Sequence, residues 1–158
     1  MGIGFTAQGF DRSAPYRRQV GSFDPRAAFI FAGIGQDELI GDFESLVLSY
    51  GAAGFELDRA EPTLGTPAHT LVLASSYGHS DSYQHVVEEV LMTDPLQGGT
   101  VNPEVRADMV YFEYPNGGAV SATGSIAWCG ALSHNHYDNT VSRITDNVLR
   151  RFASDEPL

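Results

Sequence analysis

Short apolar runs separated by glycine- and proline-containing segments mark several candidate strands. Residues 27–33 (AAFIFAG) and 69–76 (HTLVLASS) are apolar runs with the length of a buried strand. Residues 107–114 and 118–128 are two further runs, and Asn116-Gly117-Gly118 between them is typical of a β-hairpin turn. The pattern therefore predicts a sheet that includes 27–33, 69–75, 107–114 and 118–127.

Two segments have apolar residues at helical spacing. A serine can cap residues 80–92, and Asp138 or Asn139 can cap residues 138–152. The apolar positions are Tyr83, Val86, Val87, Val90 and Leu91 in the first segment and Val141, Ile144, Val148, Leu149 and Phe152 in the second. We expect helices over about 82–92 and 139–151. Strands that alternate with helices favour an α/β layered fold, and the hairpin adds an antiparallel edge.

The remaining segments set the expected domain organisation. Residues 1–25 are rich in glycine, arginine, proline and aromatic side chains, so we interpret them as an extended lead-in that lies over other protein. Residues 26–153 then form the α/β unit, and 154–158 form a tail. Residues 41–54 fit a short helix or a strand equally well.

Composition excludes several protein classes. The chain has 158 residues, a length that fits one domain with its own core. Its single cysteine, Cys129, excludes an intramolecular disulfide framework and a cysteine-rich zinc site. No run approaches the ~18 apolar residues that a membrane-spanning helix needs. The N-terminus lacks the pattern of a secretion signal, so we expect a cytoplasmic protein.

Charge is unevenly distributed along the chain. The net charge is -11, and every basic residue is an arginine. Residues 31–142 hold Arg59 and Arg106 against fifteen acidic residues, which is a local net of -13. Such a segment repels a phosphate backbone, so we expect no nucleic-acid partner. The lack of a long apolar run likewise leads us to expect no membrane partner.

Two polar segments follow predicted strands and precede predicted helices. They are residues 75–82, which include His79, and residues 129–139, which include His134 and Asn135. If the strands are parallel, both segments open at the same edge of the sheet, so we expect His79, His134 and Asn135 to share a polar cleft. We expect Trp128 and Cys129 to be buried. The alternative for 129–139 is a helix-capping loop with a buried hydrogen-bond network.

Other groupings of reactive side chains are less specific. His85 with Glu88 and Glu89 could share a helix face and grip a metal, but no third ligand is evident, and a solvated helix face explains them. Cys129 and His134 could form a thiol–imidazole pair, although no nucleophile elbow surrounds the cysteine. The chain contains no phosphate-binding loop, HExxH or GxSxG motif.

A family resemblance extends over nearly the whole chain. It rests on GFDRSAPYRR (9–18), IGDF (40–43), GAAGFELDR (51–59), LGTPAHTLVLASS (64–76), the segment from Tyr83 to Leu91, NPEVRADMVYFEYPNGGAV (102–120) and GSIAWCGALSHNHYDNTVSRITDNVLRRF (124–152). These stretches resemble the C-terminal region of the N,N-dimethylformamidase large (beta) subunit and its homologues. The sequence departs from the family at His136, where glycine is expected, and at Ser121-Ala122, which replace a Phe-Ser pair.

The resemblance implies both a fold and an activity. The fold is a class I glutamine-amidotransferase-like α/β domain, similar to trehalose-utilisation (ThuA-like) proteins and incomplete here. The activity is that of an amidohydrolase that converts small formamides to formate and an amine. The family's iron is held by two tyrosines and a glutamate, and no motif here matches them. We therefore expect no bound iron, and no activity, for this chain alone.

The resemblance also suggests roles for residues and partners. Ser125, His134 and Asn135 become candidates for orienting substrate or metal ligands through hydrogen bonds, and His79 completes the set of candidate catalytic residues. Expected partners are the remainder of the large subunit or a small subunit, in an oligomer, with a small amide as substrate. Two other interpretations stay open: a non-catalytic structural or assembly module, and a small-molecule-binding α/β domain.

Overall fold

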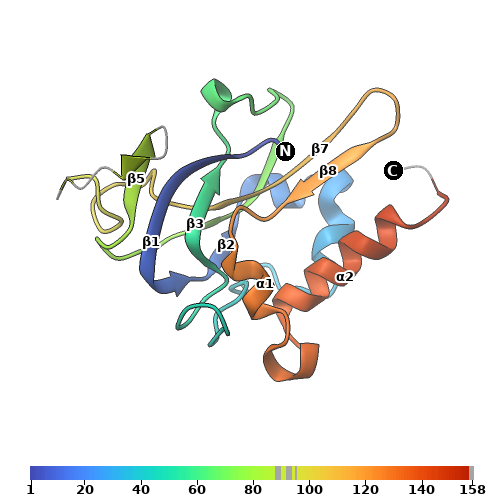
Figure 1. The fold of residues 1–158 in the computed structure, drawn as a ribbon. Helices are drawn as coiled ribbons and strands as arrows, with labels where there is room; N and C mark the ends of the chain where they lie inside the picture. The colour runs from blue at the N-terminus through green and yellow to red at the C-terminus, as the bar shows by residue number, and fades with distance from the viewer. Residues whose placement is uncertain (88–89, 92–93, 95, 157–158) are drawn as a thin grey trace.

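The computed structural model describes residues 1–87, 90, 91, 94 and 96–156 and contains both strands and helices (Figure 1). The strands are β1 (Gly4–Ala14), β2 (Tyr16–Arg18), β3 (Ala53–Arg59), β4 (Leu71–Ser76), β5 (Gln84–Val87), β6 (Val90–Leu91), β7 (Asp108–Glu113) and β8 (Ala119–Ala122). The α-helices are α1 (Ala127–Ala131) and α2 (Thr140–Phe152), and the 3-10 helices are η1 (Val20–Phe23), η2 (Pro25–Phe31), η3 (Pro62–Leu64) and η4 (His134–Tyr137).

The strands form two four-stranded sheets, with the orders β3-β1-β5-β6 and β2-β4-β7-β8. All pairings between the described strands are antiparallel. In Figure 1, β1 and β3 lie on one side of the molecule and α2 lies on the other. The mixed α/β class is therefore confirmed, while the glutamine-amidotransferase-like assignment is not. None of the described helices is long and apolar enough to cross a membrane.

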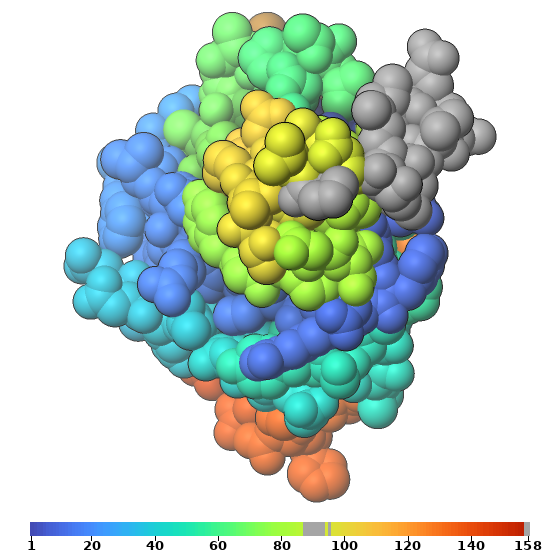
Figure 2. Space-filling model, turned by 90° about the vertical axis from the view of Figure 1, so that its left-hand side faces the viewer, coloured from blue at the N-terminus to red at the C-terminus, as the bar shows by residue number. Residues whose placement is uncertain are grey.

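The N-terminal segment is built into the first sheet. Residues 4–14 form β1, which pairs with β3 on one side and with β5 on the other. Figure 2 looks onto this side, where the blue N-terminal segment runs between the teal and the yellow-green parts of the chain. Gly9 permits this packing, because a Cβ there would lie 2.6 Å from the Tyr83 ring. Residues 4–14 and 16–18 are extended, and residues 20–23 form the 3-10 helix η1.

The strand predicted for 27–33 is wrong. Residues 25–31 form the 3-10 helix η2 instead. Pro25 occupies its first turn, and the Asp24 carboxylate accepts a hydrogen bond from the backbone N–H of Arg26 at 3.0 Å. Both features favour helix initiation. The buried side chains Ala27, Ile30 and Phe31 recur at the spacing of a helix, so apolar content alone did not distinguish the two conformations.

The helix predicted for 82–92 is also wrong. Residues 84–87 form β5, which pairs with β1 in the register Ala7–His85 and Gln8–Gln84, and 90–91 form β6. Residues 88, 89 and 92 lie outside the described part of the chain. The segment is rich in valine, whose branched side chain suits a strand, and the open edge of β1 supplies backbone partners.

The remaining predicted elements are confirmed with shifted ends. The predictions at 69–75 and 107–114 correspond to β4 and β7, and the prediction at 139–151 corresponds to α2. The last predicted strand ends at Ala122, because Gly124 has a positive φ of 77° and the chain then enters α1. The undecided segment 41–54 consists of turns and bends until β3 begins at Ala53.

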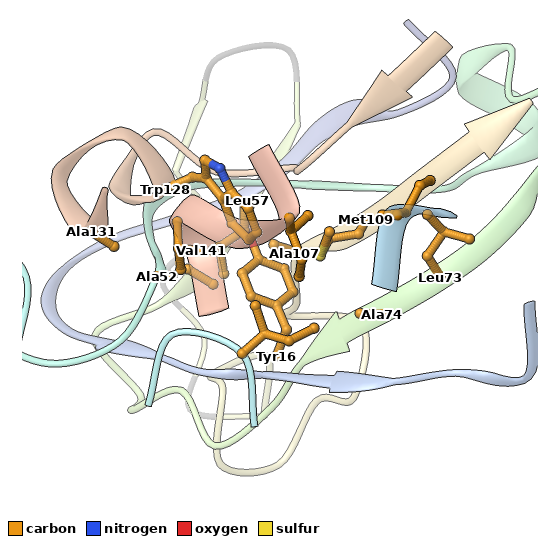
Figure 3. Close-up of a cluster of buried hydrophobic side chains, with 14 of the residues drawn as sticks. Tyr16, Ala52, Leu57, Leu73, Ala74, Ala107, Met109, Trp128, Ala131 and Val141 are labelled. Carbon is orange, nitrogen blue, oxygen red and sulfur yellow. The ribbon is translucent and has the colours of Figure 1, made fainter. Parts of the chain in front are cut away.

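The core lies between the two sheets and the C-terminal helices (Figure 3). The fully buried Tyr16 packs edge-on against Trp128, with ring centroids 5.8 Å apart. Its hydroxyl donates a hydrogen bond to the Thr123 carbonyl at 2.7 Å. Trp128 is 5% exposed, so its predicted burial is confirmed, whereas Cys129 faces solvent and its predicted burial is wrong. Buried aliphatic residues such as Leu57 each contribute roughly 1.5–3 kcal/mol.

Candidate functional site

The structure separates the polar loops that were expected to meet. His134 and Asn135 line a hollow of about 380 Å³ together with Glu38, Asp42 and Asp138, and His79 is not among its lining residues. Strands β4 and β8 both pair antiparallel with β7, so they run in the same direction as the expectation required. Helix α1 nevertheless lies between the end of β8 and His134, and the chain after β4 leads His79 to Tyr83, next to β5 of the other sheet. The shared cleft of His79, His134 and Asn135 does not form.

His79 is a buried, neutral histidine. The backbone N–H of Ala107 donates to Ser76 Oγ at 2.8 Å, and Ser76 Oγ and His79 Nε2 share a hydrogen bond, also at 2.8 Å. His79 Nδ1 finds no hydrogen-bond partner among the described residues. The ring packs against Tyr83 at 4.6 Å. Burial lowers the pKa of His79 to about 4, so the imidazole is uncharged at neutral pH.

Ser125 uses its hydroxyl to hold two distant segments together. Its Oγ donates to the Gly54 carbonyl at 2.6 Å and accepts from the Gly54 N–H at 2.7 Å and the Ala127 N–H at 3.2 Å. One hydroxyl has a single proton to donate and two lone pairs, so its hydrogen-bonding capacity is filled. The group ties β3 to the start of α1 and has no remaining lone pair or proton for a substrate.

The segment 134–138 forms a capping loop. Asn139 accepts from the Ser142 N–H at 2.9 Å and donates to the carbonyls of Leu132 and His134 at 3.0 and 2.7 Å. Asn135 Nδ2 donates to the Asp138 carbonyl at 3.0 Å, and the His134 ring stacks on Phe43 at 4.0 Å. Asn139, one of the two predicted caps, is therefore the N-cap of α2. The contacts match the helix-capping alternative, except that the hydrogen bonds are part-buried or exposed instead of buried.

Three consecutive residues of this loop have left-handed backbone angles. The φ values of Asn135, His136 and Tyr137 are 50°, 55° and 68°. Each such residue other than glycine costs roughly 1–2 kcal/mol, and asparagine tolerates the conformation best. The family resemblance leads us to expect glycine at position 136. The positive φ there explains this expectation, because glycine adopts such angles without strain. Figure 2 shows the orange segment of the chain around η4 protruding at the lower end of the molecule.

The described members of the two weaker groupings are not assembled as metal or thiol sites. His85 accepts a hydrogen bond from Asn102 Nδ2 at 3.2 Å and lies 4.0 Å from a Glu104 carboxylate oxygen, while Glu88 and Glu89 lie outside the described residues. Cys129 is exposed on α1, and the His134 ring stacks on Phe43. The described residues of neither grouping supply a recognisable reaction centre.

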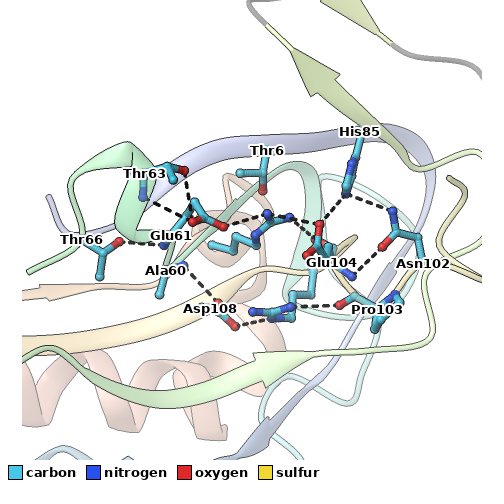
Figure 4. A network of polar contacts seen from close by, with 12 residues as sticks. Thr6, Ala60, Glu61, Thr63, Thr66, His85, Asn102, Pro103, Glu104 and Asp108 are labelled. Atoms are coloured by element: carbon cyan, nitrogen blue, oxygen red, sulfur yellow. Dashed lines mark hydrogen bonds and ion pairs between the residues drawn. The ribbon is translucent and has the colours of Figure 1, made fainter. Parts of the chain in front are cut away.

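A buried carboxylate that the sequence analysis did not single out organises the second sheet (Figure 4). Asp108 has no exposed surface and accepts hydrogen bonds from Ser75 Oγ at 2.6 Å, Arg106 Nε at 3.0 Å and the Ala60 N–H at 3.0 Å. Arg59 is similarly held by Glu61 at 3.0 Å. Removing one partner of such a network would leave a buried charge unpaired and would destabilise the fold. We therefore interpret the Asp108 network as structural. The signal available in the sequence was an acidic residue at the start of an apolar run.

The residues present do not fit the iron centre implied by the resemblance. Within the described ranges, no group of three or more His, Cys, Asp and Glu side chains is arranged to hold a metal ion. Burial raises the pKa values of Tyr16, Tyr83 and Tyr111, to about 12 for Tyr111. The Tyr111 hydroxyl donates a hydrogen bond to Glu113 Oε1 at 2.9 Å. These phenols are held protonated, whereas tyrosinate is the form that binds ferric iron.

Comparison with known proteins identifies the family. Residues 1–139 match the model of the family described as N,N-dimethylformamidase beta subunit-like, C-terminal. The chain belongs to this family. It is 47% identical over 156 residues to the N,N-dimethylformamidase beta subunit of Paracoccus aminophilus, and 46% identical over 156 residues to that of an Alcaligenes species. Each match covers 99% of this chain and 20% of the relative, so the chain spans about a fifth of their length.

One further match covers less than half of the chain. Inosine-5'-monophosphate dehydrogenase of Helicobacter pylori is 33% identical over 72 residues, which cover 44% of this chain and 15% of that enzyme. A match of this extent does not indicate a family.

Proposed function

We propose that this chain is the C-terminal portion of an N,N-dimethylformamidase-like amidohydrolase, which hydrolyses small formamides to formate and an amine. The observation that carries the proposal is the 47% identity to a dimethylformamidase beta subunit along 99% of the chain. The complete enzyme would be cytoplasmic and oligomeric, and the partners of this chain would be the remainder of the large subunit and a small subunit. The class I glutamine-amidotransferase-like, ThuA-like fold is proposed for the complete catalytic domain.

Within that enzyme, we infer that this chain supports the catalytic region and does not carry the reacting groups. Ser125 and Asn139 satisfy backbone groups of their own domain, and His79 is buried. His134 and Asn135, at the rim of a hollow, are the candidates best placed to orient a neighbouring group. This inference joins the amidohydrolase proposal with the alternative of a structural module, and it favours that alternative for this part of the enzyme.

We further propose that the iron ligands lie in parts of the enzyme outside this chain. The protonated state of the buried tyrosines supports this, because their phenol protons would have to be lost to bind ferric iron. The purified chain, incubated with ferric iron and desalted, should retain less than one equivalent of metal and show no tyrosinate absorption. Stoichiometric, coloured iron would contradict the assignment.

A chimera tests the function directly. In the Paracoccus aminophilus beta subunit, the matching C-terminal fifth is replaced by this chain, and dimethylamine release from N,N-dimethylformamide is measured in the assembled enzyme. We expect the chimera to turn over the substrate, and we expect a subunit lacking the region, and this chain alone, to be inactive. A well-folded, assembled chimera without activity would refute functional equivalence. Turnover by the isolated chain would refute the supporting role.

A further inference from the structure

Strand β8 forms an outer edge of the second sheet. At the opposite edge, β2 is closed by reciprocal hydrogen bonds between Tyr16 and Ile40 at 2.9 and 3.0 Å. In the first sheet, β3 is met by Gly124, whose carbonyl accepts from the Asp58 N–H at 2.8 Å. No described segment pairs with the outer side of β8. Figure 1 shows the β7–β8 hairpin projecting from the body of the molecule.

The hairpin register identifies which backbone groups of β8 are open. The Tyr114 N–H donates to the Gly118 carbonyl at 2.6 Å, and the register continues without a bulge through Phe112–Val120 and Val110–Ala122. Hydrogen-bonded pairs alternate along an antiparallel ladder, so Val120 and Ala122 direct their backbone groups towards β7. The N–H and C=O groups of Ala119 and Ser121 therefore face outward.

This edge lacks the features that normally prevent strands from pairing. Exposed edges are usually protected by charged side chains, by proline or by a bulge. Residues 114–137 contain no Asp, Glu, Lys or Arg, and β8 itself contains no proline. The rest of the chain carries a net charge of -11, so two copies repel each other over most of their surfaces. The uncharged segment is where a second copy can approach without like-charge contacts.

We propose that β8 pairs antiparallel with β8 of a second copy of this chain, around a two-fold axis at Val120. The two open residues flank Val120 symmetrically, so Ala119 of one copy meets Ser121 of the other and each pair exchanges both backbone hydrogen bonds. Such an edge is self-complementary under two-fold symmetry. The two Val120 residues face each other as a non-hydrogen-bonded pair, with Cα atoms about 4.5 Å apart.

The expected dimer is weak, because a four-residue edge buries less than the ~1,200 Å² of a standard stable interface. We expect a dissociation constant on the order of 100 µM. Sedimentation equilibrium of the 158-residue chain from micromolar to millimolar concentration measures it. Raising the salt concentration should tighten the dimer by screening the negative charges. A chain that stays monomeric throughout, or a dimer that salt weakens, would overturn the proposal.

Two pairs of variants locate the interface. Ser121→Pro removes an outward N–H and leaves the β7 ladder intact, and it should weaken dimerisation at least about tenfold, whereas Ser121→Ala should change it less than about twofold. Val120→Glu places like charges opposite each other and should abolish the dimer, whereas Val120→Thr keeps the branched side chain and should retain it. Circular dichroism confirms that each variant is folded.

Hydrogen exchange supplies a readout that needs no substitution. In the wild-type chain, the Ala119 and Ser121 amides should become more protected as concentration rises, while the Val120 amide, already bonded to β7, should not change. A dimer that forms without this protection, or that survives both Ser121→Pro and Val120→Glu, would show that another surface carries the association. The outcome does not depend on amide hydrolysis.

Discussion

Ser125 and Gly54 exchange two hydrogen bonds although 71 residues separate them in the sequence. The Ser125 hydroxyl thereby acts as an extra rung beside β3, at the point where the chain turns into α1. The glycine is required here, because a Cβ at position 54 would lie 2.1 Å from Ser13 Oγ and 2.9 Å from Tyr83 Oη. The pair thereby joins two of the separate stretches that carry the family resemblance, residues 51–59 and residues 124–152.

We predict that Ser125→Ala lowers the free energy of unfolding by about 1–3 kcal/mol, since it leaves the Gly54 N–H and C=O without their partner. Urea denaturation measures the change. Ser121→Ala, at a half-buried serine of β8, is the matched control and should shift stability by less than about 0.5 kcal/mol. In the chimeric enzyme, the activity of Ser125→Ala per folded subunit should be unchanged. A large loss of turnover without loss of stability would instead assign Ser125 a role in catalysis.

We predict that His136→Gly stabilises the chain by about 0.5–1 kcal/mol. Glycine removes the roughly 1–2 kcal/mol of strain at φ 55°, partly offset by its greater freedom in the unfolded state. Ser133→Gly is the control, because Ser133 has a right-handed φ of -78° and glycine there should destabilise. Thermal melting of the two variants should shift in opposite directions. A destabilised His136→Gly variant would mean that the His136 side chain makes a contact that outweighs the strain.

We predict that Asn139→Ala destabilises more than Asn135→Ala. Asn139 caps α2 and holds two further carbonyls, so its loss should cost about 1–2 kcal/mol, whereas Asn135 makes one exposed bond. Melting temperature and formamide turnover of the chimera are measured on both variants. If this segment acts only as a capping loop, the chimera that carries Asn135→Ala should keep its activity. A loss of ~10–100-fold in turnover with unchanged melting would establish that Asn135 orients a ligand or substrate.

We predict that stability falls as the pH is lowered from 7 towards 4 because of His79. Its pKa is about 4 when folded and 6.5 in its ordinary state, so the unfolded chain binds a proton in this window that the folded chain excludes. The contribution is fully present above pH 6.5 and is lost progressively down to about pH 4, up to about 3 kcal/mol. Urea denaturation at pH 7, 6 and 5 measures the slope, and His79→Gln should flatten it. An equal slope in both proteins would assign the effect to other groups.

The candidate site could be predicted from sequence only where the signal was local. The cap of α2 was within reach, because asparagine immediately before an amphipathic segment is a short-range signal. The burial of His79, the Ser125–Gly54 pair and the Asp108 network were not, since each depends on which strands become neighbours. The expected cleft failed because α1 separates the end of β8 from His134, although β4 and β8 run in the same direction.

The sequence by itself determined the elements whose hydrogen bonds and apolar faces are local. The helix α2 carries its own cap and apolar stripe, and the β7–β8 hairpin carries its own turn at Asn116-Gly117-Gly118. Pro25 after Asp24 was a local signal for η2 that the strand prediction, based on the apolar run, did not use.

Only the tertiary structure decided the state of residues whose local pattern was ambiguous. The segment that begins at Tyr83 has apolar positions that fit a helix, yet it forms β5, because β1 presents unpaired backbone groups that a strand satisfies and a helix cannot. Residues 4–14 have no evident period, and from the sequence alone we interpret them as part of a lead-in. Through the same pairing they form β1, an internal strand of the first sheet. Backbone hydrogen bonds between segments distant in the chain are a property of their neighbours, and one segment's sequence does not encode them.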